Sequence, residues 1–120
     1  MDSAYDLFRR GTALLEAGDC HAAIVPLSRA RDLEPAKASV REALGRALFG
    51  ARRYREAADE FAGVVAGAPT NDYALFCLGR SLQLLGEHDQ ARHPLALAAC
   101  LRPERDDYRR YLDRARRSAA

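Results

Sequence analysis

The sequence predicts an all-α protein, a solenoid of three antiparallel helix pairs with one more helix at its C-terminus. The first observation is that prolines, glycines and alanines recur along the chain at a constant spacing of about 34 residues. They are Pro35, Pro69 and Pro103; Gly11, Gly45 and Gly79; and Ala23, Ala57 and Ala91. The second is that apolar residues within each step recur at helical spacing. A period of roughly 20–50 residues indicates one supersecondary unit copied along the chain.

Each unit is predicted to form a helix, a tight turn and a second helix, because turn residues separate two apolar stripes. In the first unit, about residues 4–37, the stripes are Leu7, Gly11 and Leu14, then Ala23, Leu27, Ala30 and Leu33. In the second, about residues 38–71, they are Leu44, Gly45 and Leu48, then Ala57, Phe61 and Val64. In the third, about residues 72–105, they are Leu78, Gly79 and Leu82, then Ala91, Leu95, Ala98 and Leu101. We expect one domain over residues 1–120.

The repeated glycines lie inside the first predicted helix of each unit, where glycine costs about 0.5–1 kcal/mol relative to alanine. Because glycine recurs at Gly11, Gly45 and Gly79 despite this cost, we expect a close approach of the two helices in each pair. Pro26 and Pro94, which are separated by the same step, lie inside predicted second helices. For these prolines we expect either a local kink or a later helix start that moves the proline into the first turn.

About residues 105–117 are predicted to form a capping helix. Its apolar residues follow the i, i+3, i+4, i+7 pattern of one amphipathic helix: Tyr108, Tyr111, Leu112 and Ala115. Asp113 stands where a fourth unit would have its glycine, and no second helix follows. Terminal units of a solenoid need a polar outer face, which this helix provides.

On these residues the chain resembles the tetratricopeptide repeat (TPR) family over about residues 4–105. The shared pattern is a large apolar residue, Leu-Gly, an aromatic residue or Leu, Ala, an aromatic residue or Leu, Ala, and Pro. Modest departures are Arg10 where Leu is usual, Arg41 where a bulky apolar residue is usual, and Val64 in place of Ala. Arg41 predicts looser packing at the start of the second unit. The resemblance implies a right-handed α-solenoid whose first helices line a concave groove that holds the ligand.

Composition argues against several other classes of protein. The 120 residues are 48% hydrophobic and 30% charged, which is typical of a soluble globular protein. No apolar run approaches the roughly 18 residues needed to cross a bilayer, and the first residues lack the pattern of a secretory signal. We therefore expect a cytoplasmic location and no membrane partner. The use of 18 arginines and one lysine fits a GC-rich, bacterial genome.

The sequence offers no catalytic, cofactor or metal site. Its three cysteines (Cys20, Cys77 and Cys100) have no CxxC spacing, and His88 and His93 are five residues apart rather than on one helix face. No motif of a hydrolase, a nucleotide-binding loop or a metalloprotease occurs. The chain is therefore predicted not to be an enzyme.

The predicted binding surface is the groove face of the three first helices. It carries Tyr5, Phe8, Arg9 and Thr12 in the first unit, Glu42, Arg46 and Phe49 in the second, and Tyr73, Phe76 and Arg80 in the third. Helical spacing puts the members of each set on one face. Aromatic residues and arginine are enriched in binding hot spots, and arginine forms bidentate bonds with carboxylates. A peptide or helix with apolar and acidic groups is the expected partner; the alternative is that several aromatic residues only pack between neighbouring helices.

Some TPR domains hold the C-terminal carboxylate of heat-shock chaperones with Lys, Asn and Arg at set places in the groove. In this chain the corresponding places hold Phe8 and Thr12, Ala43, and Tyr73 and Cys77. None matches, which argues against that specificity. The predicted function is a non-catalytic protein–protein interaction module.

Two alternatives stay open at the level of sequence. One is a self-associating scaffold element that forms a weak homo-oligomer. The other, less favoured, is a nucleic-acid-binding accessory protein. The net charge is only +2, and a pI of about 8.6 is below the value of about 9 typical of nucleic-acid-binding domains.

Overall fold

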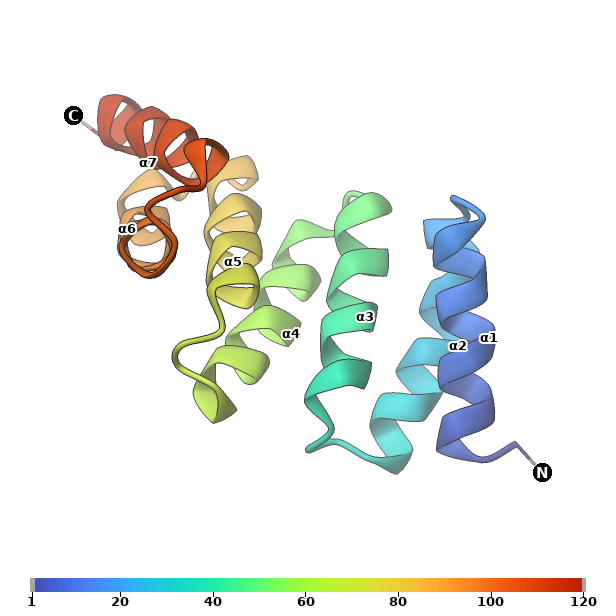
Figure 1. The fold of residues 1–120 in the computed structure, drawn as a ribbon. Helices are drawn as coiled ribbons and strands as arrows, with labels where there is room; N and C mark the ends of the chain where they lie inside the picture. Colours follow the sequence, from blue (N-terminus) through green and yellow to red (C-terminus); the bar gives the residue numbers. More distant parts are fainter. Residues whose placement is uncertain (1, 120) are drawn as a thin grey trace.

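The computed structural model describes residues 2–119. Within this range the chain forms seven helices (Figure 1). Their bounds are α1 Ala4–Glu16, α2 Cys20–Leu33, α3 Ala38–Gly50, α4 Tyr54–Gly67, α5 Asp72–Leu84, α6 His88–Leu101 and α7 Asp106–Ala119. This range contains no β-strand. The all-α prediction is confirmed, whereas the division into one domain with repeats at about residues 4–37, 38–71 and 72–105 stays a prediction.

The helices are stacked as antiparallel pairs in two layers. In Figure 1, α1, α3 and α5 lie in one layer, with α2, α4 and α6 in the layer behind them. Each helix packs mainly against its neighbours along the chain, as in other solenoids. The molecule is therefore elongated, with extents of 51 × 24 × 22 Å. The predicted solenoid of three helix pairs with a C-terminal helix is confirmed.

Three helices begin at side-chain caps that satisfy otherwise unpaired backbone amides. Ser3 Oγ, Asp19 Oδ1 and Asn71 Oδ1 each accept a hydrogen bond from the amide three residues further on, at 3.0–3.1 Å. At Ser3 the carboxylate of Asp6 reaches back to the Ser3 amide, which completes a capping box. These caps fix the starts of α1, α2 and α5.

The tight turn within each pair has the same backbone geometry in all three units. Gly18 and Gly86 have φ angles of 83° and 81°, and Arg52, at the equivalent position of the second unit, has a φ of 63°. At all three positions the amide donates to the carbonyl three residues earlier, at 2.9–3.0 Å. The left-handed region suits glycine and is costly for other residues. The second unit therefore keeps the turn despite its arginine.

The periodic glycines mark close approaches between the helices of each pair, as predicted. A Cβ atom at Gly79 would lie 2.5 Å from Leu95 Cγ, and one at Gly45 would lie 2.9 Å from the Phe61 ring. A Cβ atom at Gly11 would overlap the side chain of Leu27 in the same way. Each large side chain therefore occupies the space that its glycine leaves free.

Replacing Gly79 with alanine is expected to lower the free energy of unfolding by about 1–2 kcal/mol. Overpacking against the fully buried Leu95 outweighs the gain in helix propensity. Gly67→Ala is the matched control, since Gly67 ends α4 and a Cβ atom there meets nothing within 4 Å. Urea unfolding followed by circular dichroism measures both variants. Equal losses at the two positions would contradict the packing role of Gly79.

Pro26 and Pro94 are both buried inside continuous helices. Each is the seventh residue of its helix, because α2 begins at Cys20 and α6 begins at His88. A later helix start is therefore wrong for both prolines. The missing amide at each position leaves one carbonyl in the preceding turn without its helical donor.

Arg41 does not loosen the second unit, contrary to the sequence-based expectation. Its Nε donates to Glu60 Oε1 at 3.1 Å, and its guanidinium lies over Gly63, where a Cβ atom would overlap it. Arg31 Nη1 donates to the other oxygen of Glu60 at 2.6 Å. Glu60 is only 6% exposed, so one buried carboxylate joins α2, α3 and α4. An ionic contact takes the place of the usual apolar one.

The C-terminal helix α7 covers the end of the solenoid and packs against α6 and α5. Its apolar stripe, Tyr108, Leu112 and Ala115, is buried. Tyr108 Oη donates to Asp72 Oδ2 at 2.7 Å, which links α7 to the start of α5. No helix in residues 2–119 has the length and apolar character needed to span a membrane.

Candidate functional site

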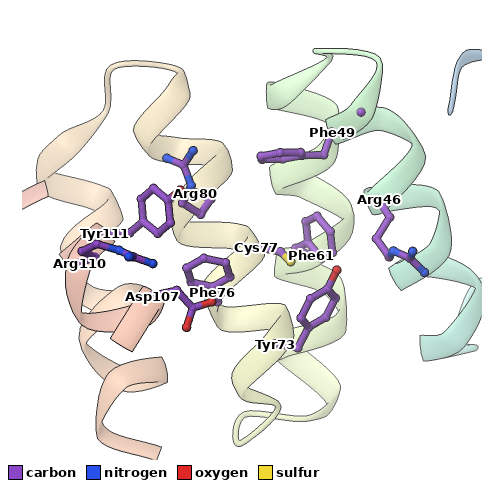
Figure 2. A pocket seen from close by; sticks show the side chains of 11 residues that line it. Arg46, Phe49, Phe61, Tyr73, Phe76, Cys77, Arg80, Asp107, Arg110 and Tyr111 are labelled. Atoms are coloured by element: carbon purple, nitrogen blue, oxygen red, sulfur yellow. The ribbon is translucent and has the colours of Figure 1, made fainter. Parts of the chain in front are cut away.

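A pocket of about 520 Å³ lies between α3, α5 and α7, in the size range of ligand sites. It is lined by Arg46, Phe49 and Gly50 of α3, Phe61 of α4, Tyr73, Phe76, Cys77 and Arg80 of α5, and Asp107, Arg110 and Tyr111 of α7. Figure 2 shows aromatic rings in the middle of the pocket, with Arg46 at one side and Arg110 at the other. The site therefore combines an apolar floor with cationic edges.

Packing between helices holds the aromatic rings in place. Phe76 stacks on the buried Tyr108 with ring centroids 4.6 Å apart, and Phe49 meets Tyr54 edge-on at 5.3 Å. Phe61 is fully buried and reaches the pocket from the second layer. Such aromatic pairs contribute about 0.5–1.5 kcal/mol beyond the area they bury. The floor is thus preformed rather than assembled on binding.

The α7 side of the pocket is fixed by contacts around Tyr111. The guanidinium of Arg80 lies 4.0 Å from the centroid of the Tyr111 ring, and that of Arg114 lies 4.9 Å from it. Gln83 Nε2 donates to the Tyr111 carbonyl at 2.8 Å, and its Oε1 accepts from Arg80 Nη1 at 2.8 Å. Arg80 and Gln83 therefore connect α5 to the wall that α7 provides.

Two polar groups of the pocket, Tyr73 and Cys77, are held neutral. Burial raises the pKa of Cys77 to about 12 and that of Tyr73 to about 12. Both groups therefore keep their protons near pH 7, and Cys77 does not have the reactive thiolate of a nucleophile.

The arginines of the pocket differ in their surroundings. Desolvation by burial lowers the pKa of Arg80. Arg46 and Arg110 are exposed and form no salt bridge with any residue of the described range 2–119. Asp107, the carboxylate of this lining, accepts from Arg105 Nε at 3.0 Å and Nη2 at 2.8 Å. Positive charge in the pocket therefore exceeds negative charge.

Five of the ten predicted groove residues line this pocket: Arg46, Phe49, Tyr73, Phe76 and Arg80. The other five lie outside it. Tyr5 is 63% exposed on α1, with Arg9 stacked over its ring at 5.8 Å. Phe8 packs against two core clusters, as the packing alternative expected for some of the aromatic residues. Thr12 Oγ1 donates to its own helix, at Phe8 O, and Glu42 lies half-buried on α3.

Sequence reasoning missed the residues of the pocket that come from other elements. Periodicity places Phe61 in the core, where it also belongs, and places Asp107, Arg110 and Tyr111 in the capping helix. A signal for Tyr111 was present, because it lies at the edge of the α7 apolar stripe, beside Tyr108. The position of α7 against α5 could not be read from periodicity, since α7 has no counterpart in the repeats.

The sequence matches the tetratricopeptide repeat family model over residues 8–72 and again over residues 43–109. The chain belongs to the tetratricopeptide repeat family. Members of this family are generally non-catalytic, and the fold supports a protein–protein interaction module. Within residues 2–119 no group of three or more His, Cys, Asp or Glu side chains is placed to hold a metal ion.

Solved structures of other TPR proteins share the fold. The first TPR of Spaghetti (RPAP3) bound to the HSP90 peptide SRMEEVD is 18% identical, with a TM-score of 0.89 over 99% of this chain and 96% of that one. A structure of MamA is 22% identical, with a TM-score of 0.91 over 97% of this chain. The Sgt2 TPR domain from Aspergillus fumigatus is 17% identical, with a TM-score of 0.84 over 97% of this chain and 78% of that one.

This TPR chain spans 63% of that MamA structure. No curated protein sequence matches it. At these identities the similarity to solved structures establishes the fold and leaves the ligand to be inferred from the pocket itself.

Proposed function

We propose that this TPR chain is a non-catalytic interaction module that binds a peptide or helix of a partner protein in its concave groove. The observation that carries the proposal is the preformed pocket between α3, α5 and α7, whose aromatic floor is bordered by arginines. Aromatic residues and arginine supply most hot-spot energy in protein interfaces. A cytoplasmic location stays a prediction.

The expected ligand differs from the chaperone peptide in the related structure. The TPR of Spaghetti carries the HSP90 peptide SRMEEVD, which supports the use of such a groove for peptides. In this chain the places that hold Lys, Asn and Arg in chaperone-binding TPR domains are occupied by other residues, Phe8, Ala43 and Tyr73 among them. We therefore propose a peptide that is held by a large apolar side chain together with acidic groups.

Self-association through the terminal helix is less favoured than binding of a separate partner. Such an oligomer would place the apolar stripe of α7 in the groove of another copy. That stripe is already buried within its own chain, with Tyr108 at 0% and Leu112 at 7% exposure. The helix therefore has little apolar surface left to offer.

Arg46 provides the test of this function. We expect Arg46→Glu to weaken peptide binding at least about tenfold, because a hot-spot contact is lost and a repulsive charge is introduced. Peptides are first selected from a displayed random library on the unaltered protein, and their affinities are then measured by fluorescence anisotropy. Arg80 is unsuitable for this test, since its contact with Tyr111 makes it part of the structure.

The control is Arg29→Glu, which makes the same charge change on an exposed arginine of α2, in the other layer. Thermal unfolding verifies that both variants keep their fold. Equal affinities for Arg46→Glu and Arg29→Glu would place the binding site outside the groove, and failure to select any peptide would reject the proposed function.

A further inference from the structure

The C-terminal helix is part of the pocket as well as a cap for the solenoid. Asp107, Arg110 and Tyr111 project from α7 toward Phe76 and Arg80 of α5, as Figure 2 shows. The Tyr111 ring lies 5.6 Å from that of Phe76. A side chain that enters the pocket therefore meets α5 and α7 together.

The fixed contacts of α7 make this wall suitable for recognition. Tyr111 is held between the guanidinium groups of Arg80 and Arg114, and its carbonyl accepts a hydrogen bond from Gln83. The Tyr108 hydroxyl is bound to Asp72. Side chains whose rotamers are locked by packing and hydrogen bonds lose little entropy on binding.

The charges of the residues that line the pocket favour an anionic partner. Three arginines face the pocket, and the carboxylate of Asp107 is already occupied by two hydrogen bonds from Arg105. Arg46 and Arg110, on opposite sides of the aromatic floor, have no carboxylate within salt-bridge distance in residues 2–119. Arg80 is partly desolvated, and it donates to the neutral amide oxygen of Gln83. An incoming carboxylate would compensate guanidinium groups that the protein leaves unpaired.

We propose that the pocket binds an acidic peptide segment that inserts one large apolar side chain between carboxylates directed to Arg46 and to Arg110. The inserted side chain contacts Phe76 and Tyr111, and Arg110 makes α7 a specificity-determining element. The inference rests on the proposed function and adds to it the placement of the acidic groups and α7 as a second contact helix. It predicts a preference for acidic residues on both sides of the apolar anchor.

A peptide fits these observations better than single-stranded nucleic acid. Nucleic-acid grooves combine stacking rings with a positively charged track that follows the backbone over several nucleotides. Here the arginines surround one local pocket, and the whole chain has a net charge of only +2. One anchor side chain with flanking carboxylates matches a local pocket of this kind.

The test uses an array of synthetic nonapeptides with a central Phe, Leu or Trp and flanking residues that are all Glu, all Gln or all Lys. We expect the 120-residue chain to bind the Glu series at least about tenfold more tightly than the Gln series, and to bind the Lys series weakest. Arg110→Glu is expected to abolish the preference for Glu at the flank that faces α7. Peptides with Glu on one side only identify that flank.

Arg117→Glu is the matched control, because it makes the same change on an exposed arginine of α7 that does not line the pocket. It is expected to keep the affinity and the flank preference. One outcome would separate the two proposals: peptides bind, Arg46→Glu weakens their binding, and Arg110→Glu behaves like Arg117→Glu. The proposed role of α7 in specificity would then be wrong, and the proposed function would stand. If no peptide binds, both fail, and stronger binding of a labelled oligothymidylate than of any peptide would assign the pocket to nucleic acid instead.

Discussion

Replacing Glu60 with alanine is expected to lower the free energy of unfolding by about 3 kcal/mol, because the loss of one partner from a buried ionic cluster typically costs about 3–5 kcal/mol. The carboxylate holds Arg31 at 2.6 Å and Arg41 at 3.1 Å. Its removal leaves Arg31 with only the exposed Asp32 and leaves Arg41 without its carboxylate partner. Their side chains are 32% and 28% exposed, so water compensates part of the loss. The expected value therefore lies at the lower end of the range.

The matched control is Glu56→Ala on the same helix. Glu56 pairs with Arg53 at 2.6 Å, but both side chains are largely exposed. A pair of this kind contributes about 0.2–1 kcal/mol. Urea unfolding of the two variants separates a buried contact from a surface one. Similar losses for Glu56→Ala and Glu60→Ala would show that the Glu60 cluster contributes no more than an ordinary surface ion pair.

A third variant tests whether the charges themselves are needed. Exchange of all three residues for apolar ones (Arg31→Leu, Arg41→Met and Glu60→Leu) removes the desolvation cost together with the ionic contacts. Buried ionic clusters replaced in this way are often as stable as before or more stable. We expect the triple variant to be more stable than Glu60→Ala. A larger loss in the triple variant would mean that packing around the cluster, not the unpaired charge, governs stability.

The sequence was sufficient to predict the fold because the information is local and repeated. Gly79 and Leu95 illustrate the reason, since a glycine and a large apolar residue recur at these positions in every unit and each pair forms the same interhelical contact. Side chains in a solenoid contact only neighbouring units, so one repeated pattern determines one repeated structure. The contacts of Glu60 have no such signal, because they occur in one unit only and Arg41 departs there from the repeated pattern.

The site could be predicted only in part because equivalent positions have unequal neighbours. Tyr5 and Phe8 match Tyr73 and Phe76 in register, yet Tyr5 is 63% exposed and Phe8 packs against the core. Phe76 also packs against the core, but it stacks there on Tyr108 of a helix that follows only the third unit. Helical periodicity assigns a residue to a face, whereas the next element along the chain decides whether that face is covered, open or part of a pocket.

Phe61→Ala is expected to lower the free energy of unfolding by about 3–5 kcal/mol. Phe61 is fully buried, belongs to the largest core cluster and fills the space above Gly45. Its removal leaves a cavity that the helices on either side cannot close without moving. Leu33→Ala is the control, since Leu33 is 59% exposed and its truncation is expected to cost less than about 1 kcal/mol.

A double-mutant cycle tests whether Gly45 and Phe61 form one packing pair. Gly45→Ala alone forces a methyl group to within 2.9 Å of the Phe61 ring, so we expect a loss of about 1–2 kcal/mol. In a Phe61→Ala background the truncated side chain leaves room for that methyl group, and the same substitution should cost less. We expect a coupling energy of about 0.5–2 kcal/mol, so that the double variant loses less stability than the sum of the two single losses. Strictly additive losses would mean that Phe61 and Gly45 act independently, and that the recurring glycine and large residue in each unit do not form one packing pair.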